Sequence, residues 1–363
     1  MSHCTPSPRR WALALLAIAA ACSQAQADTL LVVRKSADAV DFIDPGSGLR
    51  LASVAVGHAP HEISVSPDGR FAAVSNYGSA ERPGSTLSII DLQQPRELRR
   101  LDLAPHSRPH GLDWFAPDRL ALTTQGSQSL LLVDPTAGRI VAATGTGQDT
   151  PHMVAVAPDG RRAYVANIVS GSVTVIDLAA GTASGTVVTG AGTEAIAVRP
   201  GGTQVWTFAR GDGALVIMDA ATLERISTAE VPGIPIRVAF TPDGSTAFVT
   251  RAALGEVTAF DAATGKPVAR RRLEVPLAAD ADSRPFAGIA PGSPLPVGLV
   301  VARDGRTIFV AATMADRVVQ LDARTLEVLR SIAVDGEPDG LGLTPVVPKA
   351  VCHACAPEAP PAP

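Results

Sequence analysis

The sequence is poor in cysteine and in aromatic residues, and these shortages limit the folds it can adopt. Its four cysteines are Cys4, Cys22, Cys352 and Cys355, so no disulfide can cross-link the long stretch between the two pairs. A chain of 363 residues without such a link depends on a large apolar core, which its 46% of hydrophobic residues can supply. Aromatic residues make up only 4%, against 32 glycines and 30 prolines, which suits many short strands joined by tight turns.

Positive charge is scarce as well. The chain has three lysines, and its formal net charge is −4. Proteins that bind nucleic acids usually carry a basic excess, and those that bind single strands also need aromatic side chains for stacking. The composition therefore disfavours a nucleic-acid partner, and we expect a monomer that binds another protein or a small ligand.

The N-terminal segment has the pattern of a cleaved secretory signal. Arg9-Arg10 precedes the apolar run Trp11 to Ala21, and Ala25-Gln26-Ala27 matches a cleavage site. The run is about half the roughly 20 residues that a membrane span needs, so we expect no transmembrane segment in the mature protein. Cleavage of residues 1–27 predicts a periplasmic or secreted protein and takes the net charge from −4 to −6. A lipoprotein that begins at Cys22 is the alternative.

One unit recurs along the whole chain from residue 28 onward. Each copy has an alternating run that ends in aspartate and a later run closed by Pro-Asp-Gly or a variant, as at Pro158-Asp159-Gly160. Aspartate at a strand end can accept hydrogen bonds from backbone N–H groups two residues on, and proline and glycine set the φ angles of a turn. The aspartates that end the alternating runs lie 42 to 61 residues apart: Asp44, Asp91, Asp134, Asp177, Asp219, Asp261 and Asp322.

Four strands in each copy of about 42 residues are typical of a propeller blade. Seven copies predict an all-β, seven-bladed propeller over residues 28–345. The first copy starts at Asp28 with what is the second strand elsewhere. The last copy ends on Gly340 to Pro345, which matches the innermost strand of the other copies. We therefore expect the C-terminal strand to join the first blade and close the ring, which removes open sheet edges.

The repeat resembles the YVTN family of β-propellers, which includes exported bacterial proteins. Tyr164-Val165-Ala166-Asn167 nearly spells the family's tetrapeptide, and Phe248-Val249-Thr250-Arg251 is a looser version. The resemblance spans nearly all of the mature chain and implies a fold rather than a function, because similar propellers serve as lactonases, quinoprotein subunits and a DNA binder.

Two insertions and five histidines interrupt the regularity. Residues 77–85 lengthen the loop between the second and third strands of one blade, and residues 276–296 lengthen a loop that leads into an innermost strand. Connections of these two kinds emerge on the same face of a propeller, which we call the top face. The five histidines of the body all precede or begin innermost strands: His58, His61, His106, His110 and His152.

Three of these histidines follow a proline at the same repeat position, so we expect them at the mouth of the central channel. The trio is His61, His110 and His152, and we align Glu194, Arg237, Gly298 and Gly340 with it, with Asp339 next to the last. The trio has three interpretations: bonds to a neighbouring blade, a ligand or divalent metal site for Zn²⁺ or Cu²⁺, or acid–base catalysis. Further candidates for ligand binding are Glu194, Arg237, Asp339, Arg34 and Arg251.

The C-terminal residues 346–363 are proline-rich, and we expect a disordered tail. Cys352-His353-Ala354-Cys355 lacks the histidine directly after the second cysteine that heme attachment needs, because Ala356 stands there. In an oxidising compartment, a disulfide between Cys352 and Cys355 is the favoured state, and partial metal ligation or a redox pair remain alternatives.

Two classes of function fit these observations. The first is a non-catalytic binding module that presents its top face and channel mouth to a protein or small ligand, and the absence of a nucleophile motif favours it. The second is an enzyme of lactonase-like or metal-assisted hydrolytic type that uses the histidine cluster. Pyrroloquinoline quinone is disfavoured, since its enzymes typically carry tryptophan docking motifs and a disulfide near the cofactor, whereas the body has no cysteine and only Trp114 and Trp206.

Overall fold

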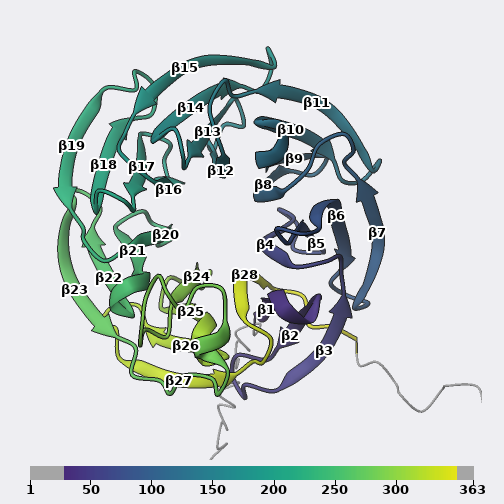
Figure 1. Ribbon diagram of the computed structural model, residues 1–363, viewed down its shortest axis with the longest axis vertical. Coiled ribbons are helices and arrows are strands. Elements are labelled where there is room, and N and C mark those ends of the chain that lie inside the picture. The colour runs from purple at the N-terminus through teal and green to yellow at the C-terminus, as the bar shows by residue number, and fades with distance from the viewer. Residues whose placement is uncertain (1–27, 350–363) are drawn as a thin grey trace, which may run out of the picture.

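The computed structural model describes residues 28–349, which form a ring of seven four-stranded antiparallel sheets around a central channel (Figure 1). The expected fold is confirmed. The signal segment and the Cys352–Cys355 pair lie outside the described residues, so those two predictions remain open.

The innermost strands border the channel, and each begins at the top face. They are β28 (Pro338–Thr344), β4 (Pro60–Val65), β8 (Pro109–Ala116), β12 (Pro151–Val156), β16 (Thr193–Val198), β20 (Pro235–Phe240) and β24 (Pro296–Val301). The second strands return to the top face. They are β1 (Thr29–Arg34), β5 (Phe71–Gly78), β9 (Arg119–Thr124), β13 (Arg162–Asn167), β17 (Gln204–Ala209), β21 (Thr246–Arg251) and β25 (Thr307–Ala312).

The third strands pair with the second and end in the repeated aspartates, except β2, which ends one residue earlier. They are β2 (Ala39–Ile43), β6 (Pro83–Asp91), β10 (Ser129–Asp134), β14 (Ser172–Asp177), β18 (Ala214–Asp219), β22 (Glu256–Asp261) and β26 (Arg317–Asp322). The outermost strands are the most exposed. They are β3 (Arg50–Ala55), β7 (Arg96–Asp102), β11 (Arg139–Gly145), β15 (Thr182–Val188), β19 (Arg225–Glu230), β23 (Lys266–Arg272) and β27 (Val328–Ala333).

The repeated aspartates have the predicted role in turns. Asp177 Oδ1 accepts hydrogen bonds from the N–H groups of Ala179 and Ala180 at 2.9 and 2.8 Å. The other six aspartates accept a bond from a backbone N–H two or three residues on. A side-chain acceptor thus fixes the turn from the third to the fourth strand of every blade.

The apolar core lies between neighbouring blades. Trp206 and Phe208 are fully buried and pack against Phe260 of the next blade. The same packing closes the ring, where Leu30 and Val32 of the first blade meet Phe309 of the last. The closing sheet has the strand order β28-β1-β2-β3, so the C-terminal strand completes the first blade as expected.

Short 3-10 helices fill several loops at the top face. They are η1 (Lys35–Ala37), η2 (Gln125–Ser127), η3 (Ala252–Leu254), η4 (Ala281–Ser283) and η5 (Thr313–Ala315). Among the described residues, no helix has the length or the apolar content required to cross a bilayer.

Candidate functional site

The same backbone conformation in every blade directs seven side chains into the channel mouth. The residue before each innermost strand has a positive φ, between 43° and 70°, and the strand then bulges just after its first residue. In β12, for example, Pro151 pairs with Asn167 and Met153 pairs with Ala166, which leaves His152 without a partner in the ladder. A bulge of this kind redirects a side chain, and here it turns each unpaired residue toward the channel.

The observed strands correct the sequence alignment by one residue in β20, β24 and β28. The residues that follow the first strand residue are His61, His110, His152, Glu194, Ile236, Val297 and Asp339. Arg237, Gly298 and Gly340 each lie one position deeper. All seven strands have this bulge, so it does not set these three apart. The residue directly after Pro235, Pro296 and Pro338 is the one equivalent to the histidines, as the residue after Pro60, Pro109 and Pro151 is.

These residues line a cavity of about 320 Å³ whose two sides differ in chemistry. One side is formed by aromatic and imidazole rings from blades two to four: His61, Tyr77, His110 and His152. The opposite side is apolar and comes from β20, β24 and the insertion before β24: Ile234, Ile236, Phe286, Ile289, Leu295 and Val297. A concave, mostly apolar site with a few polar groups is the usual form of a small-molecule site.

A hydrogen-bond chain uses both ring nitrogens of His152. Tyr77 donates its hydroxyl to Gln125 Oε1 at 2.8 Å, so the Gln125 amide nitrogen faces His152 Nδ1 at 2.6 Å. His152 Nδ1 must then accept, and Nε2–H faces Glu194 Oε1 at 3.3 Å. Arg210 completes the chain at 2.7 Å from Glu194 Oε2. His152 is thereby held as one neutral tautomer.

The other two histidines retain free nitrogens. His61 Nδ1 lies 3.2 Å from Asp339 Oδ2, and its Nε2 makes no hydrogen bond or ion pair within residues 28–349. His110 stacks on His152 with 3.7 Å between ring centroids, and its Nδ1 is buried without a partner in the described structure. His61 thus has the carboxylate-oriented arrangement of an imidazole that binds iron or zinc through its second nitrogen.

An ion pair crosses the channel beneath the imidazoles. Arg237 of β20 reaches across the channel and donates to the Glu62 carboxylate of β4, and it also contacts the Met153 sulfur at 3.3 Å. Both partners are largely buried, with side-chain exposures of 14% and 9%. The cavity therefore has a charged floor and opens at the top face.

Burial and neighbouring charges perturb the ionisation of this site. Burial lowers the pKa of His110 well below its usual value of 6.5, and the positive charge of Arg237 lowers it further. Burial raises the pKa of Glu62 despite the Arg237 charge. Burial alone would also raise the pKa of Asp339, but the hydrogen bond and charge of His61 lower it overall. Burial thus favours the neutral imidazole of His110.

The structure brings most of the predicted residues together, but not all of them. Arg34 is held by Asp335 and Asp41, and Arg251 by Glu256 and the Pro232 carbonyl, and neither lines the cavity. Within residues 28–349, no group of three or more His, Cys, Asp or Glu side chains has the geometry to hold a metal ion. Metal binding by the histidine trio stays a prediction, and the stacked rings do not favour it.

Sequence reasoning missed much of the cavity lining, including five residues whose side chains are polar or aromatic. These are Tyr77, Gln125, Phe286, Glu62 and Lys35. Two of them carried a signal, because Tyr77 is one of two tyrosines and Phe286 lies in the longer insertion. Gln125 and Lys35 are on 3-10 turns that follow second strands, where sequence gives no indication of direction.

One family model matches part of this chain. The model of the cytochrome D1 heme domain matches residues 116–274, from the last residue of β8 to just past β23. The match includes His152, Glu194 and Arg237 but begins after His61 and His110. It covers less than half of the chain, and the YVTN resemblance stays an expectation. No curated protein matches the sequence.

Two solved structures share the fold at low sequence identity. Hydrazine synthase of Kuenenia stuttgartiensis is 18% identical with a TM-score of 0.67, over 82% of this chain and 93% of that one. A functionally unknown protein of Desulfotomaculum acetoxidans DSM 771 is 13% identical with a TM-score of 0.71, over 88% and 99%. At these identities the likeness concerns the fold alone.

Proposed function

We propose that this chain is an exported propeller that binds a heme-type iron tetrapyrrole at the channel mouth. The observation that carries the proposal is the two-sided cavity, which opposes imidazoles to an apolar wall. A tetrapyrrole is flat and largely apolar, takes axial nitrogen ligands at its iron and carries carboxylates at one edge. The partial match to a heme domain supports the same class of ligand.

The residues present fit this group. His61 offers Nε2 while Asp339 holds Nδ1, so His61 would be the iron ligand. His110, on the same side of the cavity, has a buried Nδ1 without a partner within residues 28–349 and would contact the ring. Arg210 is 40% exposed beside the cavity and can pair with a carboxylate. A bound heme would supply redox chemistry and an open iron coordination site.

In this proposal the protein's own residues hold and orient the ligand and do not react with it. His152 is committed to Gln125 and Glu194, so it cannot act as a free base without breaking two contacts. This supports the non-catalytic form of the proposal over metal-assisted hydrolysis by the trio. Binding of a protein partner at the top face and release to the periplasm or medium belong to the same proposal, and they rest on the sequence.

Hemin titration tests the proposal. We expect the exported protein to bind one hemin, shift its Soret band toward the position of an imidazole complex and melt at a higher temperature. The titration uses a background with Cys352→Ser, His353→Ala and Cys355→Ser, because thiols and imidazoles bind iron on their own. His61→Ala should remove the imidazole signature, and Asp339→Asn should weaken binding by about 10–100-fold.

The matched control is His58→Ala. His58 lies near the mouth and contacts Asp38 at 3.4 Å, but it does not line the cavity. Its loss should leave the hemin spectrum unchanged. A wild-type background that shows no stoichiometric spectral shift would contradict the proposal.

A further inference from the structure

The longer insertion forms the apolar side of the cavity. It connects β23 to β24 and has its own small core, in which Ala281 and Ala290 are buried against Ile236, Leu295 and Met314. Its Phe286 is partly buried and its Ile289 is 47% exposed, and both line the cavity opposite the imidazoles. An aliphatic side chain that stays half exposed within a cavity is available to contact a ligand.

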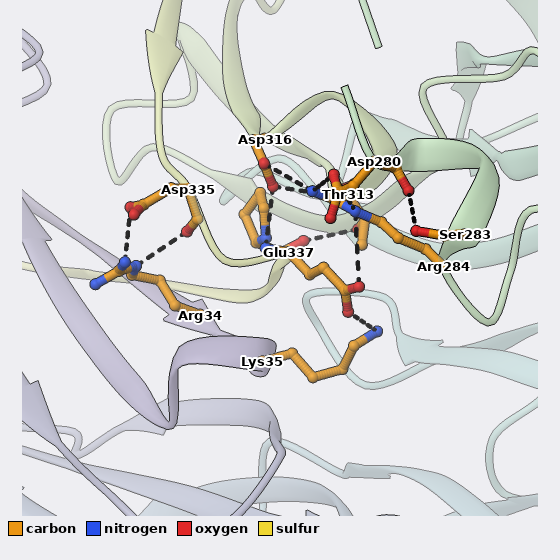
Figure 2. Close-up of polar contacts among 10 residues, drawn as sticks. Arg34, Lys35, Asp280, Ser283, Arg284, Thr313, Asp316, Asp335 and Glu337 are labelled. Carbon is orange, nitrogen blue, oxygen red and sulfur yellow. Dashed lines mark hydrogen bonds and ion pairs between the residues drawn. The ribbon is translucent and has the colours of Figure 1, made fainter. Parts of the chain in front are cut away.

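A buried arginine fixes the insertion to the rest of the propeller (Figure 2). Arg284 has a side-chain exposure of 6% and binds both oxygens of Asp316, at 3.0 and 2.8 Å, and the Thr313 carbonyl at 2.7 Å. It also binds Asp280 within the insertion at 2.6 Å. The paired, planar geometry of guanidinium and carboxylate sets the orientation of the segment as well as its position.

The same cluster reaches Phe286 from the first blade. Glu337 lies 3.7 Å from Arg284 and 3.3 Å from Lys35, and the Lys35 ammonium sits 4.7 Å from the centre of the Phe286 ring. Figure 2 shows Glu337 between the two cations. The ring is therefore held between the insertion and η1 by a cation–π contact.

We infer that this insertion selects the ligand, with Phe286 and Ile289 contacting its flat apolar face and Arg284 acting as their positioning residue. The inference rests on the proposed function and adds the residues that recognise the ring system independently of its iron. Ligands without an extended apolar plane would then bind poorly even when they offer iron to His61. The imidazole side supplies coordination, and the insertion supplies selectivity.

Parallel titrations with hemin and with metal-free protoporphyrin IX separate the two contributions. The experiment uses the full mature chain with the three tail substitutions. We expect Phe286→Ala to weaken binding of both probes by about tenfold, because the wall contacts the ring whether or not iron is present. The Soret position of the hemin that still binds should not change. His61→Ala should weaken hemin binding by a larger factor than protoporphyrin binding, because only hemin offers iron to its Nε2.

Conservative variants and a distant phenylalanine provide the controls. Phe286→Tyr should restore affinity, Arg284→Met should behave like Phe286→Ala, and Arg284→Lys should fall between. Phe115→Ala removes a partly buried phenylalanine near the opposite end of β8 and should change neither titration. If Arg284→Met does not fold, the Phe286→Ala and Phe286→Tyr variants test the inference without it.

Failure of this inference can be distinguished from failure of the proposed function. A wild-type background that binds hemin, together with a Phe286→Ala variant that binds both probes as tightly, would overturn this inference and leave the proposed function standing. A wild-type background that binds neither probe would refute the proposed function, and the inference with it.

Discussion

At the residue scale, the stacked pair of His110 and His152 shows how one repeat position acquires different roles. The two side chains follow the same backbone bulge in adjacent blades, yet His152 uses both nitrogens and His110 uses neither in a protein hydrogen bond. The difference arises from what the neighbouring loops supply. Gln125 and Glu194 reach His152, whereas Tyr77 meets His110 edge-on, with 5.4 Å between ring centroids.

The buried imidazole of His110 predicts a pH-dependent stability. Because burial lowers its pKa well below 6.5, the unfolded chain takes up a proton below pH 6.5 while the folded protein does not. The free energy of unfolding should therefore fall as pH drops from about 7.5 to about 5.5, by up to about 1.4 kcal/mol per pH unit from this group. Denaturant unfolding at several pH values measures it.

His110→Phe isolates this contribution, since it keeps a ring against His152 but cannot be protonated. The variant should lose less stability than the wild type over the same interval. The raised pKa of Glu62 acts in the opposite direction in both proteins, and the lowered pKa of Asp339 matters only at more acid pH, so both cancel in the comparison. Parallel curves for the two proteins would show that His110 is protonated in the folded state.

At the element scale, the blades depend on side-chain acceptors at the turn between the third and fourth strands. Asp177 is the example, with two backbone N–H donors within 2.9 Å. An aspartate occupies each such turn. The repeat could therefore be recognised in the sequence although the strands differ in composition. The turn therefore sets where each outer strand begins.

Asp177→Ala should lower the free energy of unfolding by about 1 kcal/mol, as for loss of a capping acceptor, and Asp177→Asn by less because the amide oxygen still accepts. Asp261→Ala, two blades away, should cost a similar amount. Because the two turns share no partners, the double variant should lose the sum. Equal losses for Asp177→Ala and Asp177→Asn would show that charge, rather than acceptance, is what the turn requires.

At the scale of the whole molecule, ring closure joins the two ends of the chain in one sheet. β28 pairs with β1 over Thr29↔Thr344 to Arg34↔Pro338, and Thr29 Oγ1 donates to the Val346 carbonyl at 2.8 Å. The same junction carries Lys35 and Glu337, which hold Phe286 at the cavity. Closure thus stabilises the fold and completes the candidate site.

A chain that ends at Asp335 lacks β28 and should expose the edges of β1 and of the neighbouring blades. We expect aggregation, or unfolding without a single cooperative transition, whereas a chain that ends at Pro348 should melt like the full protein. Light scattering and calorimetry measure both properties. A monomeric Asp335 truncation with the full-length melting curve would contradict the closure argument.

The sequence by itself determined the architecture, because turn aspartates, Pro-Asp-Gly marks and alternating runs are local signals that repeat seven times. It also placed His61, His110 and His152 at one mouth, since equivalent repeat positions must converge on the ring axis. Only the tertiary structure decided their roles. Whether an imidazole keeps a free nitrogen depends on Gln125, Glu194 and Asp339, which come from other loops and other blades.

The apolar side of the cavity could not be predicted from the sequence either. Residues 276–296 were recognisable as an insertion, but their direction depends on Arg284 reaching Asp316 and on Lys35 reaching Phe286 from the opposite end of the chain. The one-residue misplacement of Arg237 has a different origin, because Pro235 begins β20 just as Pro151 begins β12, and the residue after each proline is the equivalent one. Local sequence signals determine the repeated fold, whereas contacts between distant segments determine the arrangement of the candidate site.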